Sequence, residues 1–467
     1  MGGRASPGPD PGAAAGIATQ TPGGNPTRGF PHAVNDWKSM PIESPIVAPN
    51  ESRTSFYRYT FVIGAAAFAT TIAQTEVIGQ LPIRYLLKEH LHAAPEDMSL
   101  FLFFAALAWY LKPLAGLISD SIPLWGTRRR SYLMIGAGTA GICWILLGII
   151  HQSYHSILFV VMTLNLMMVF ASTAMGGMLV EQAQRFGATG RLSALREGLN
   201  SFAVTIGLPM GGYLAAHAIG WTAILAAGLL FSLALCVFIF LKEERGAKRN
   251  SEVWSIAGIQ LKTLLHAKTL WTAGCLIFLF FVTPGLATPL YYIQIDKLGF
   301  SQPFIGWLAV IGGITGMAGA LIYARTCKAL PLGPLLAGGI ILSSVLTLLY
   351  LYYESRQAAI IITAVNGLGG TLAVVPLYDL AARATPQGCE GLGFALMMSL
   401  RNLAVSGGDW IGSWLMQSWH WSFSGLVFIS AGTTLLVLFV VPLVQVEVLK
   451  GSDMGSFEDG QGGAGGS

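Results

Sequence analysis

The sequence predicts an all-α membrane protein with twelve transmembrane helices in two six-helix pseudo-repeats. Three observations lead to this fold class: an apolar composition, twelve apolar runs of bilayer length, and basic residues gathered on one side of the predicted membrane. Of the 467 residues, 53% are hydrophobic and 11% are charged, and the net charge is only +4. Soluble domains carry about 25% charged residues, so the composition excludes an ordinary soluble enzyme, a disordered chain and a nucleic-acid-binding protein.

Apolar runs recur along the chain, and a helix that spans a bilayer needs about 20 mostly apolar residues. The predicted spans are 59–85, 97–118, 132–150, 156–182, 193–216, 222–241, 270–295, 303–325, 332–353, 358–383, 391–416 and 423–448. So many runs cannot be core helices of a soluble protein, because no polar surface would remain to cover them. They divide into an N-terminal half, 58–241, and a C-terminal half, 270–449.

Three segments lie outside the two halves. Residues 1–50 and 450–467 are polar or rich in glycine and contain no apolar run, so we expect disordered tails, and the first tail lacks the apolar region of a signal peptide. Residues 242–269 form the longest and most basic loop. Its mixture of apolar and polar residues predicts either a short helix on the membrane surface or a solvated linker.

Basic residues indicate the orientation of the chain. The N-terminal tail and the even-numbered loops carry most of them, whereas the odd-numbered loops hold only Lys88, Lys297 and Arg356. Cytoplasmic loops of membrane proteins are enriched in Lys and Arg. Both termini and the 242–269 loop are therefore expected in the cytoplasm.

The two halves resemble each other weakly. The fourth span ends in Glu181-Gln-Ala-Gln-Arg185 and the tenth in Asp379-Leu-Ala-Ala-Arg383, so an acid and an arginine recur with the same spacing at corresponding places. Six-helix repeats related by an axis along the membrane normal form the major facilitator architecture, in which substrate sites lie near the midplane between the halves.

Charged residues within the spans are the first candidates for substrate or coupling groups, because a charge at bilayer depth must face a cavity or a partner. On the first span, Glu76, Gln80 and Arg84 are four residues apart and are predicted to form one helical stripe. Glu76 is expected to face the cavity. Lys112 on the second span either faces the cavity or fastens two helices.

The eleventh span carries two further candidates, Arg401 and Asp409. They are eight residues apart and share a helix face, about 12 Å from each other along the axis. Arg401 is expected near mid-depth, facing the cavity as an anion anchor. Asp409 either faces the cavity or pairs with another helix.

A second group of residues is expected at a cytoplasmic gate. Gly116-Leu-Ile-Ser-Asp120 and Gly126-Thr-Arg128-Arg129-Arg130 follow the second span, where facilitator transporters carry a Gly-x-x-x-Asp and Gly-x-Arg-Arg element. Gly116 should let two helices approach closely, and Asp120 should cap or pair across the two halves. The other expected gate residues are Arg128, Arg129, Arg130, Glu181, Arg185, Asp379 and Arg383.

Four stretches together point to a known family. The most specific runs from Lys112-Pro113 through Gly116, Asp120 and the three arginines to Tyr132-Leu133. The other stretches are Leu81–Leu91, then Pro284–Tyr292 followed by Leu298–Ser301, Gly306, Gly319 and Tyr323, and last Pro386–Asn402. Together they resemble the folate–biopterin transporter family, a branch of the major facilitator superfamily.

The resemblance implies a carrier of folates or pterins that is coupled to protons. The family has two acidic residues near the end of the fourth span, and this sequence has Gly177 and Glu181 in those places. The missing carboxylate leaves the coupling ion and the substrate open. The alternatives are a facilitator permease for another solute, of muropeptide or sugar type, and a multi-pass membrane enzyme.

A pterin is flat and rich in hydrogen-bonding groups, so aromatic rings and amides are further candidates. The candidate rings and amides are Trp109, Trp144, Tyr291, Tyr292, Trp307, Trp410, Asn165, Asn200, Asn366 and Gln294. Pro284, Gly285 and Pro289 interrupt the seventh span beside Tyr291 and Tyr292. A broken helix in lipid must line a cavity or pack on protein, so this segment is the predicted substrate-side gate.

Enzymatic, metal and cofactor functions find little support in the sequence. The five cysteines lie singly, and neither a Cys-x-x-Cys pair nor a Cys/His cluster with metal-ligand spacing occurs. The eight histidines form no HExxH motif, and no phosphate-binding loop is present. We therefore expect no metal and no cofactor, with the bilayer and a small-molecule substrate as partners of a monomeric chain.

Overall fold

The computed structural model describes residues 49–151, 153–186, 188–243, 252–327, 330–386 and 389–444. The two expected tails and most of the basic part of the central loop lie outside these ranges. All contacts given below lie within one compact unit, Ser52–Ser467. No strand occurs among the described residues, as the predicted fold class requires.

Helices occupy all six predicted spans of the N-terminal half. The first span consists of α1 (Pro49–Ile72), α2 (Gln80–Tyr85) and the π-helical η2 (Leu86–His90), and the second of α3 (Pro95–Ala105), α4 (Leu107–Tyr110) and α5 (Lys112–Ser121). The remaining four are α6 (Arg130–Ile149), α7 (Tyr154–Arg185), α8 (Thr189–Ala215) and α9 (Ile219–Phe240).

The C-terminal half follows the same order. The seventh span consists of α11 (Lys268–Phe281), α12 (Ala287–Tyr292) and the π-helical η3 (Ile293–Lys297), and the next is α13 (Gln302–Thr326). The others are α14 (Leu332–Leu348) with η4 (Leu349–Tyr352), α15 (Arg356–Ala384), α16 (Glu390–Ser418), and α17 (Phe423–Leu436) with η5 (Val437–Leu443).

The central loop contains α10 (Glu252–His266), which exposes Trp254, Ile256 and Ile259 and bends by 74° from α11. Of the two alternatives for this loop, the structure favours the helix, because a solvated linker would not present an apolar face.

Seven described helices are long and apolar enough to cross a membrane: α6, α7, α9, α13, α14 with η4, α15, and α17 with η5. The bent pair of α10 and α11 adds an eighth candidate if it is counted as one span. The five predicted spans outside the seven are broken, as in the first, second and seventh, or carry charged residues, as in α8 and α16. The polar side chains and free backbone groups of such helices need hydrogen-bond partners from protein or water. We therefore expect these spans to surround a cavity.

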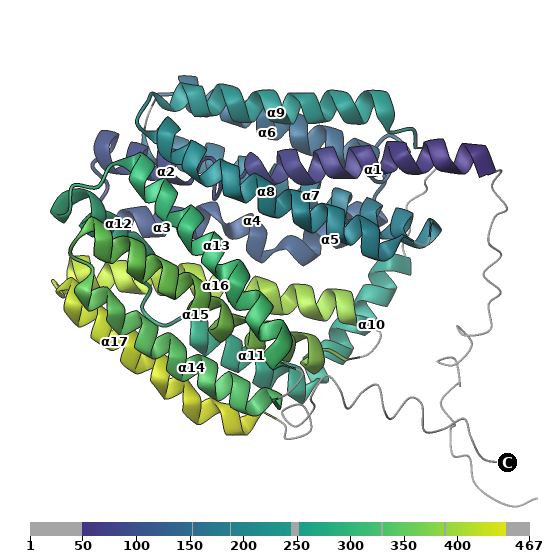
Figure 1. Ribbon diagram of the computed structural model, residues 1–467. Helices are drawn as coiled ribbons and strands as arrows, with labels where there is room; N and C mark the ends of the chain where they lie inside the picture. The colour runs from purple at the N-terminus through teal and green to yellow at the C-terminus, as the bar shows by residue number, and fades with distance from the viewer. Residues whose placement is uncertain are drawn as a thin grey trace, which may run out of the picture. The chain divides into compact units, whose positions relative to one another are not determined.

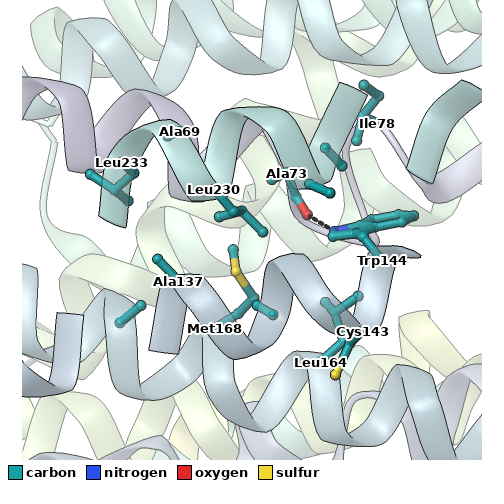
Figure 2. Packing of buried hydrophobic residues seen from close by; sticks show 14 of the residues in the cluster. Ala69, Ala73, Ile78, Ala137, Cys143, Trp144, Leu164, Met168, Leu230 and Leu233 are labelled. Atoms are coloured by element: carbon teal, nitrogen blue, oxygen red, sulfur yellow. Dashed lines mark hydrogen bonds between the residues drawn. The ribbon is translucent and has the colours of Figure 1, made fainter. Parts of the chain in front are cut away.

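The first span is not the continuous helix that the sequence predicts over 59–85. It unwinds at residues 73–79, and the fully buried Trp144 of α6 donates its indole N–H to the Ala73 carbonyl at 3.0 Å (Figure 2). Gly79 ends the unwound segment against the same indole, where a Cβ would lie 2.7 Å from Trp144 Cη2. The buried Trp144 side chain therefore provides a hydrogen-bond donor for a backbone carbonyl of the unwound segment and packs against its end. Backbone groups without a helical partner need such a donor inside a membrane.

The seventh span breaks at the predicted place, between α11 and α12. Gly285 donates its backbone N–H to the Gly408 carbonyl of α16 at 2.7 Å, and a Cβ on Gly408 would lie 2.6 Å from the Thr283 carbonyl oxygen. Gly412, one turn later, packs directly on the backbone of Gly285. Two glycines four residues apart thus bring α16 against the broken backbone.

The two halves contact each other at the end of the bundle where α2, α3 and α12 lie, opposite α5 and α10 (Figure 1). There Lys88 Nζ lies 2.5 Å from Asp296 Oδ1, Ser418 donates to Glu96 at 2.6 Å, and the Tyr292 hydroxyl donates to the Ala93 carbonyl.

Close glycine packing extends this contact between α8 and α13. A Cβ on Gly212 would lie 2.7 Å from the Gln302 carbonyl oxygen, and one on Gly306 would lie 3.1 Å from the Leu208 carbonyl oxygen. These contacts join the two halves at this end of the bundle, which the distribution of basic residues predicts to be the outer end.

The glycine contact at the seventh span can be tested on one helix. Gly412→Ala should destabilise the protein by about 1–3 kcal/mol, because its Cβ would overlap the Gly285 carbonyl and force α16 away from the broken span. Gly407→Ala on the same helix is the matched control, since a Cβ there meets nothing within 4 Å. Thermal unfolding of both variants in detergent measures the difference, and equal melting temperatures would contradict the packing.

Candidate functional site

A cavity of about 460 Å³ lies between the two halves. Its walls come from the unwound segment and α2, from α3 and α4, from the start of α12 and from the middle of α16. Five of the eight predicted substrate or coupling residues line it: Glu76, Gln80, Arg84, Arg401 and Asp409. The site therefore draws on both halves, as the repeat predicts.

Glu76 enters the cavity from the unwound segment rather than from a helical stripe. Its side chain is exposed there, and it forms no hydrogen bond or ion pair with any residue that the structure describes. Gln80 and Arg84, on α2, line the same cavity. The predicted helical stripe is therefore wrong in its local geometry, because the chain unwinds at residues 73–79, although its three side chains do meet one cavity.

Arg84 links the two halves beside the cavity. Its Nη1 lies 3.4 Å from the Ala287 carbonyl oxygen at the start of α12, and its guanidinium lies 5.7 Å from the centre of the Tyr291 ring. The Tyr291 hydroxyl accepts a hydrogen bond from Gln302 Nε2 at 2.8 Å. The aromatic ring therefore holds a cation in place without neutralising it.

Arg401 carries a guanidinium that no described carboxylate neutralises. Its centre lies 4.7 Å from the Phe281 ring and 5.7 Å from the Tyr378 ring, and Nη1 donates to Asn402 Oδ1 at 2.9 Å. Its Nε is buried without a hydrogen-bond partner among the described residues. An oriented cation with spare donors on a cavity wall is suited to bind a carboxylate or a polarised carbonyl.

Asp409 has a different role, because both of its carboxylate oxygens are occupied. Oδ1 accepts the backbone N–H of Thr288 at 2.8 Å, and Oδ2 accepts the Thr288 hydroxyl at 2.6 Å. Thr288 lies in the first turn of α12, directly after the break. A carboxylate at a helix N-terminus stabilises free N–H groups and the helix dipole, so the contacts favour the pairing alternative for Asp409.

Three predicted residues lie beside the cavity rather than on it. Lys112 donates to Ser172 Oγ at 3.2 Å and lies 5.2 Å from the Trp109 ring, which does line the cavity. Tyr291 and Tyr292 are buried in the contact between the halves. Lys112 therefore fastens α5 to α7, and the two tyrosines belong to the contact between the halves.

Among the other candidate rings and amides, only Trp109 lines the cavity. Asn165 of α7 lies behind it: its amide oxygen accepts from Thr75 at 3.1 Å and from Trp109 Nε1 at 3.4 Å, and its nitrogen donates to the Ala105 carbonyl at 2.8 Å. Asn165 thus positions the unwound segment and the Trp109 ring together. Tyr110, Asn402 and Ser406 also line the cavity but were not among the residues predicted from the sequence. Their position in the chain close to Trp109 and Arg401 is the one signal that could have identified them.

At the opposite end of the bundle, Arg129 connects two acidic gate residues. It forms an ion pair with Asp120, and its Nη2 lies 2.7 Å from Glu181 Oε1. Burial lowers the pKa of the Arg129 guanidinium, but the carboxylates of Glu181 and Asp120 raise it by more. All three residues belong to the N-terminal half, so the expected pairing of Asp120 across the two halves is not present in this conformation.

Gly177 explains how Arg129 reaches its partners. A Cβ at this position would overlap the Arg129 guanidinium, so the glycine leaves room for the cation. Gly116 has no comparable constraint, because a Cβ there would be in ordinary contact with Thr173 Cγ2 at 3.8 Å. The expectation of a close helix approach at Gly116 is therefore wrong.

Glu243, after α9, was not among the sequence candidates. Its carboxylate accepts the backbone N–H groups of Arg128 at 2.7 Å, Arg129 at 3.1 Å and Arg130 at 2.8 Å. It therefore caps the start of α6. An acid directly after a span is the signal that could have identified it.

The repeated acid–arginine pairs differ between the halves. Arg383 bonds Asp379 with Nε at 2.7 Å and Nη2 at 2.9 Å, whereas Glu181 pairs with Arg129 and Arg185 lies over the Phe186 ring. The acid–arginine spacing recurs in the sequence, but the ion pairs that the two acids form are not equivalent.

The role of Asp409 leads to a stability prediction. Asp409→Ala should lower the free energy of unfolding by about 1.5–3 kcal/mol, because it removes two hydrogen bonds to a charged acceptor at the start of α12. Thr288→Val, which keeps the backbone bond, should have a smaller effect, and Glu76→Gln should leave the melting temperature unchanged. Thermal unfolding in detergent measures all three; a stable Asp409→Ala variant would contradict the capping role.

Comparison with known proteins finds relatives over most of the chain. The chain is 29% identical over 400 residues to a folate-biopterin transporter of Synechocystis sp., covering 79% of this chain and 78% of that protein. It is 25% identical to folate transporter 1 of Plasmodium falciparum, over 73% of this chain and 70% of that one. A probable folate-biopterin transporter 2 of Arabidopsis thaliana is 23% identical over 73% and 72% of the two chains.

Solved structures share the fold at low sequence identity. The nucleoside transporter NupG superimposes with a TM-score of 0.64 at 11% identity, covering 84% of this chain and 98% of that one. A D-xylose-proton symporter gives a TM-score of 0.58 at 15% identity, covering 84% and 97%. The model of the BT1 family matches residues 75–451. Because this match covers most of the folded chain and the relatives named here are transporters, the chain belongs to the BT1 family and is a multi-pass membrane transporter, not an enzyme.

Proposed function

We propose that this transporter carries a folate- or pterin-like anion by alternating access of a twelve-span bundle, coupled to protons, with both termini in the cytoplasm. The observation that carries the proposal is the central cavity. It is lined by the Arg401 guanidinium, which no described carboxylate neutralises, and by the Glu76 carboxylate, which has no partner among the described residues. The named relatives, which are folate or folate-biopterin transporters, support the choice of substrate.

The composition of the cavity suits a flat conjugated solute with a negative group. A volume of about 460 Å³ falls within the usual range of small-molecule sites, about 300–1,000 Å³. Phe103, Trp109 and Tyr110 supply aromatic surface on the α3–α4 side, and Asn402 and Ser406 supply hydrogen-bonding groups beside Arg401. A pterin ring would lie against the aromatic wall and a carboxylate would meet Arg401.

Glu76 is the proposed coupling group. Asp409 is occupied by Thr288, so Glu76 is the cavity carboxylate with no described hydrogen-bond partner. The charged and titratable groups that face this part of the cavity are Arg84 on α2, Tyr110 on α4, and Arg401 and Asp409 on α16. A proton on Glu76 removes one negative charge from a cavity that must also admit an anionic solute.

The contact between the halves supplies the other requirement of alternating access. Lys88–Asp296, Glu96–Ser418 and Tyr292–Ala93 join the halves on the expected outer side, and they must separate to open it. On the expected inner side, Arg129 pairs with Asp120 and Glu181 of its own half, so these ion pairs do not join the halves in this conformation. Two arrangements of contacts with similar energies are what such a transition needs.

The anion anchor is tested by Arg401→Lys, which keeps the charge but loses the planar fork. We expect the apparent affinity for folate, which bears carboxylates, to fall about tenfold and the affinity for a neutral pterin to fall less, because one charge-assisted hydrogen bond is lost. Competition uptake into proteoliposomes measures both. Arg325→Lys, an exposed arginine outside the cavity, is the control. An equal loss for both solutes would contradict an anchor for the carboxylate.

The coupling group is tested by Glu76→Gln, which removes the titrating proton but keeps the shape. We expect uptake driven by a pH gradient to fall to the level without a gradient, while exchange of solute across the membrane continues. Glu354→Gln, in an exposed loop, is the matched control. Undiminished gradient-driven accumulation by Glu76→Gln would remove Glu76 from the mechanism and leave the transporter assignment intact.

A further inference from the structure

A second cavity, of about 340 Å³, lies where the loop before α6 meets the end of α9, and it shares no lining residue with the central cavity. It is lined by Trp125, Thr127, Arg130, Ser131, Met134 and Phe238. We propose that this cavity binds the phosphate headgroup of an anionic phospholipid, with Arg130 as the phosphate ligand and Trp125 as a cover over the headgroup.

The first argument is that the Arg130 side chain has unused donors. Its Nη2 donates to the Phe238 carbonyl at 2.9 Å, its guanidinium lies 5.5 Å from the centre of the Phe238 ring, and its Nε is buried without a hydrogen-bond partner among the described residues. Phosphate oxygens match the fork of donors on a guanidinium.

The second argument is that the neighbouring acids are already occupied. Glu243 accepts the backbone N–H groups that precede and begin α6, and Asp120 and Glu181 are paired with Arg129. Within the described residues, no ion pair neutralises Arg130. This wall of the cavity therefore offers a positive charge to an anion.

The third argument comes from the backbone of Trp125. Trp125 and Gly126 are the central residues of a tight turn closed by two hydrogen bonds of 3.0 Å between Leu124 and Thr127, and their φ angles are 50° and 77°. Positive φ at both positions suits Asn-Gly or Gly-Gly and disfavours a bulky residue. The turn nevertheless holds a tryptophan whose surface is 77% exposed at the mouth of the cavity. Backbone strain of this kind clusters at ligand-binding and switch regions, which makes Trp125 a candidate for contact with a ligand.

The surroundings favour a lipid over a soluble phosphate compound. Met134 and Phe238 give the cavity an apolar side, and the adjoining face of α9 exposes Leu235, Phe238 and Ile239, as a helix in contact with acyl chains does. Tryptophan is enriched at the level of the headgroups, and basic pockets at the cytoplasmic ends of spans bind anionic headgroups. A phosphate ester with two acyl chains meets all of these surfaces at once.

The test uses the full-length protein reconstituted in phosphatidylcholine nanodiscs that contain a small fraction of phosphatidylglycerol, followed by native mass spectrometry of the lipids that stay bound. Arg130→Gln should lower retention of phosphatidylglycerol about tenfold, because one charge-assisted contact is lost. Arg325→Gln is the matched control: it removes an exposed arginine near the end of α13, expected on the same membrane side, that does not line the cavity. This variant should retain phosphatidylglycerol as the wild type does.

Trp125→Gly separates lipid binding from folding. Glycine adopts positive φ without strain, so this variant should keep or raise the melting temperature, yet it should lower the retention of phosphatidylglycerol. Arg130→Gln loses its hydrogen bond to the Phe238 carbonyl and could fold poorly for that reason. In that case Trp125→Gly alone tests the proposal.

Three outcomes would overturn the proposal. Retention of phosphatidylglycerol by Trp125→Gly and by any folded Arg130→Gln at the wild-type level would remove the site. Equal loss in Arg325→Gln would show that diffuse charge attracts the lipid. Displacement of the lipid by inorganic phosphate at millimolar concentration would assign the cavity to a soluble phosphate compound instead.

Discussion

The requirement that every buried backbone group and charge find a partner inside the bundle organises the whole structure. Hydrocarbon offers no hydrogen bonds, so an interruption of a spanning helix is stable only where protein groups replace the missing bonds. Trp144 does this for the Ala73 carbonyl in the first span, and Asp409 does it for the first turn of α12 in the seventh. Both breaks lie beside the central cavity, where residues 74–76 and Ala287 contribute to the lining.

The same requirement distinguishes charged residues proposed to bind the substrate or a proton from charged residues that stabilise the fold. Asp409 lines the same cavity as Glu76 and Arg401, but both of its carboxylate oxygens already accept hydrogen bonds from Thr288. Lys112 lies beside the cavity and donates to Ser172. Glu76 has no described partner, and Arg401 has aromatic rings and one amide oxygen in place of a carboxylate. An incompletely satisfied charge is destabilising unless a ligand completes it, which is the physical reason to place substrate and proton at these two residues.

The sequence predicts much of this fold, since composition and apolar runs depend only on the bilayer. Helices occupy all twelve predicted ranges, and the break at Pro284-Gly285 is visible in the residues themselves. The unwinding at residues 73–79 is not, because it contains no proline and depends on the indole of Trp144, over 60 residues away in the chain. Which charged side chains form ion pairs or hydrogen bonds also depends on contacts between residues far apart in the sequence. The sequence spacing of Arg401 and Asp409 predicts that they share a helix face, and both line the cavity. It cannot show that Thr288 occupies Asp409, or that no described carboxylate meets Arg401.

The two halves share the same order of local structure around their helix breaks but differ in the charged residues placed there. After each break comes a short helix with proline in its first turn and tyrosine at its end, Pro82 and Tyr85 in α2 and Pro289 and Tyr292 in α12, and each continues into a π-helical turn. The N-terminal break presents the Glu76 carboxylate, which has no partner in the described part of the chain, whereas the Asp409 carboxylate caps the helix after the C-terminal break. At the other end of the bundle the asymmetry recurs, because Glu181 binds a loop arginine and Asp379 binds the arginine of its own helix. The two halves share one arrangement of the backbone, but the charged residues at their breaks differ, so the two breaks present different chemistry to the cavity.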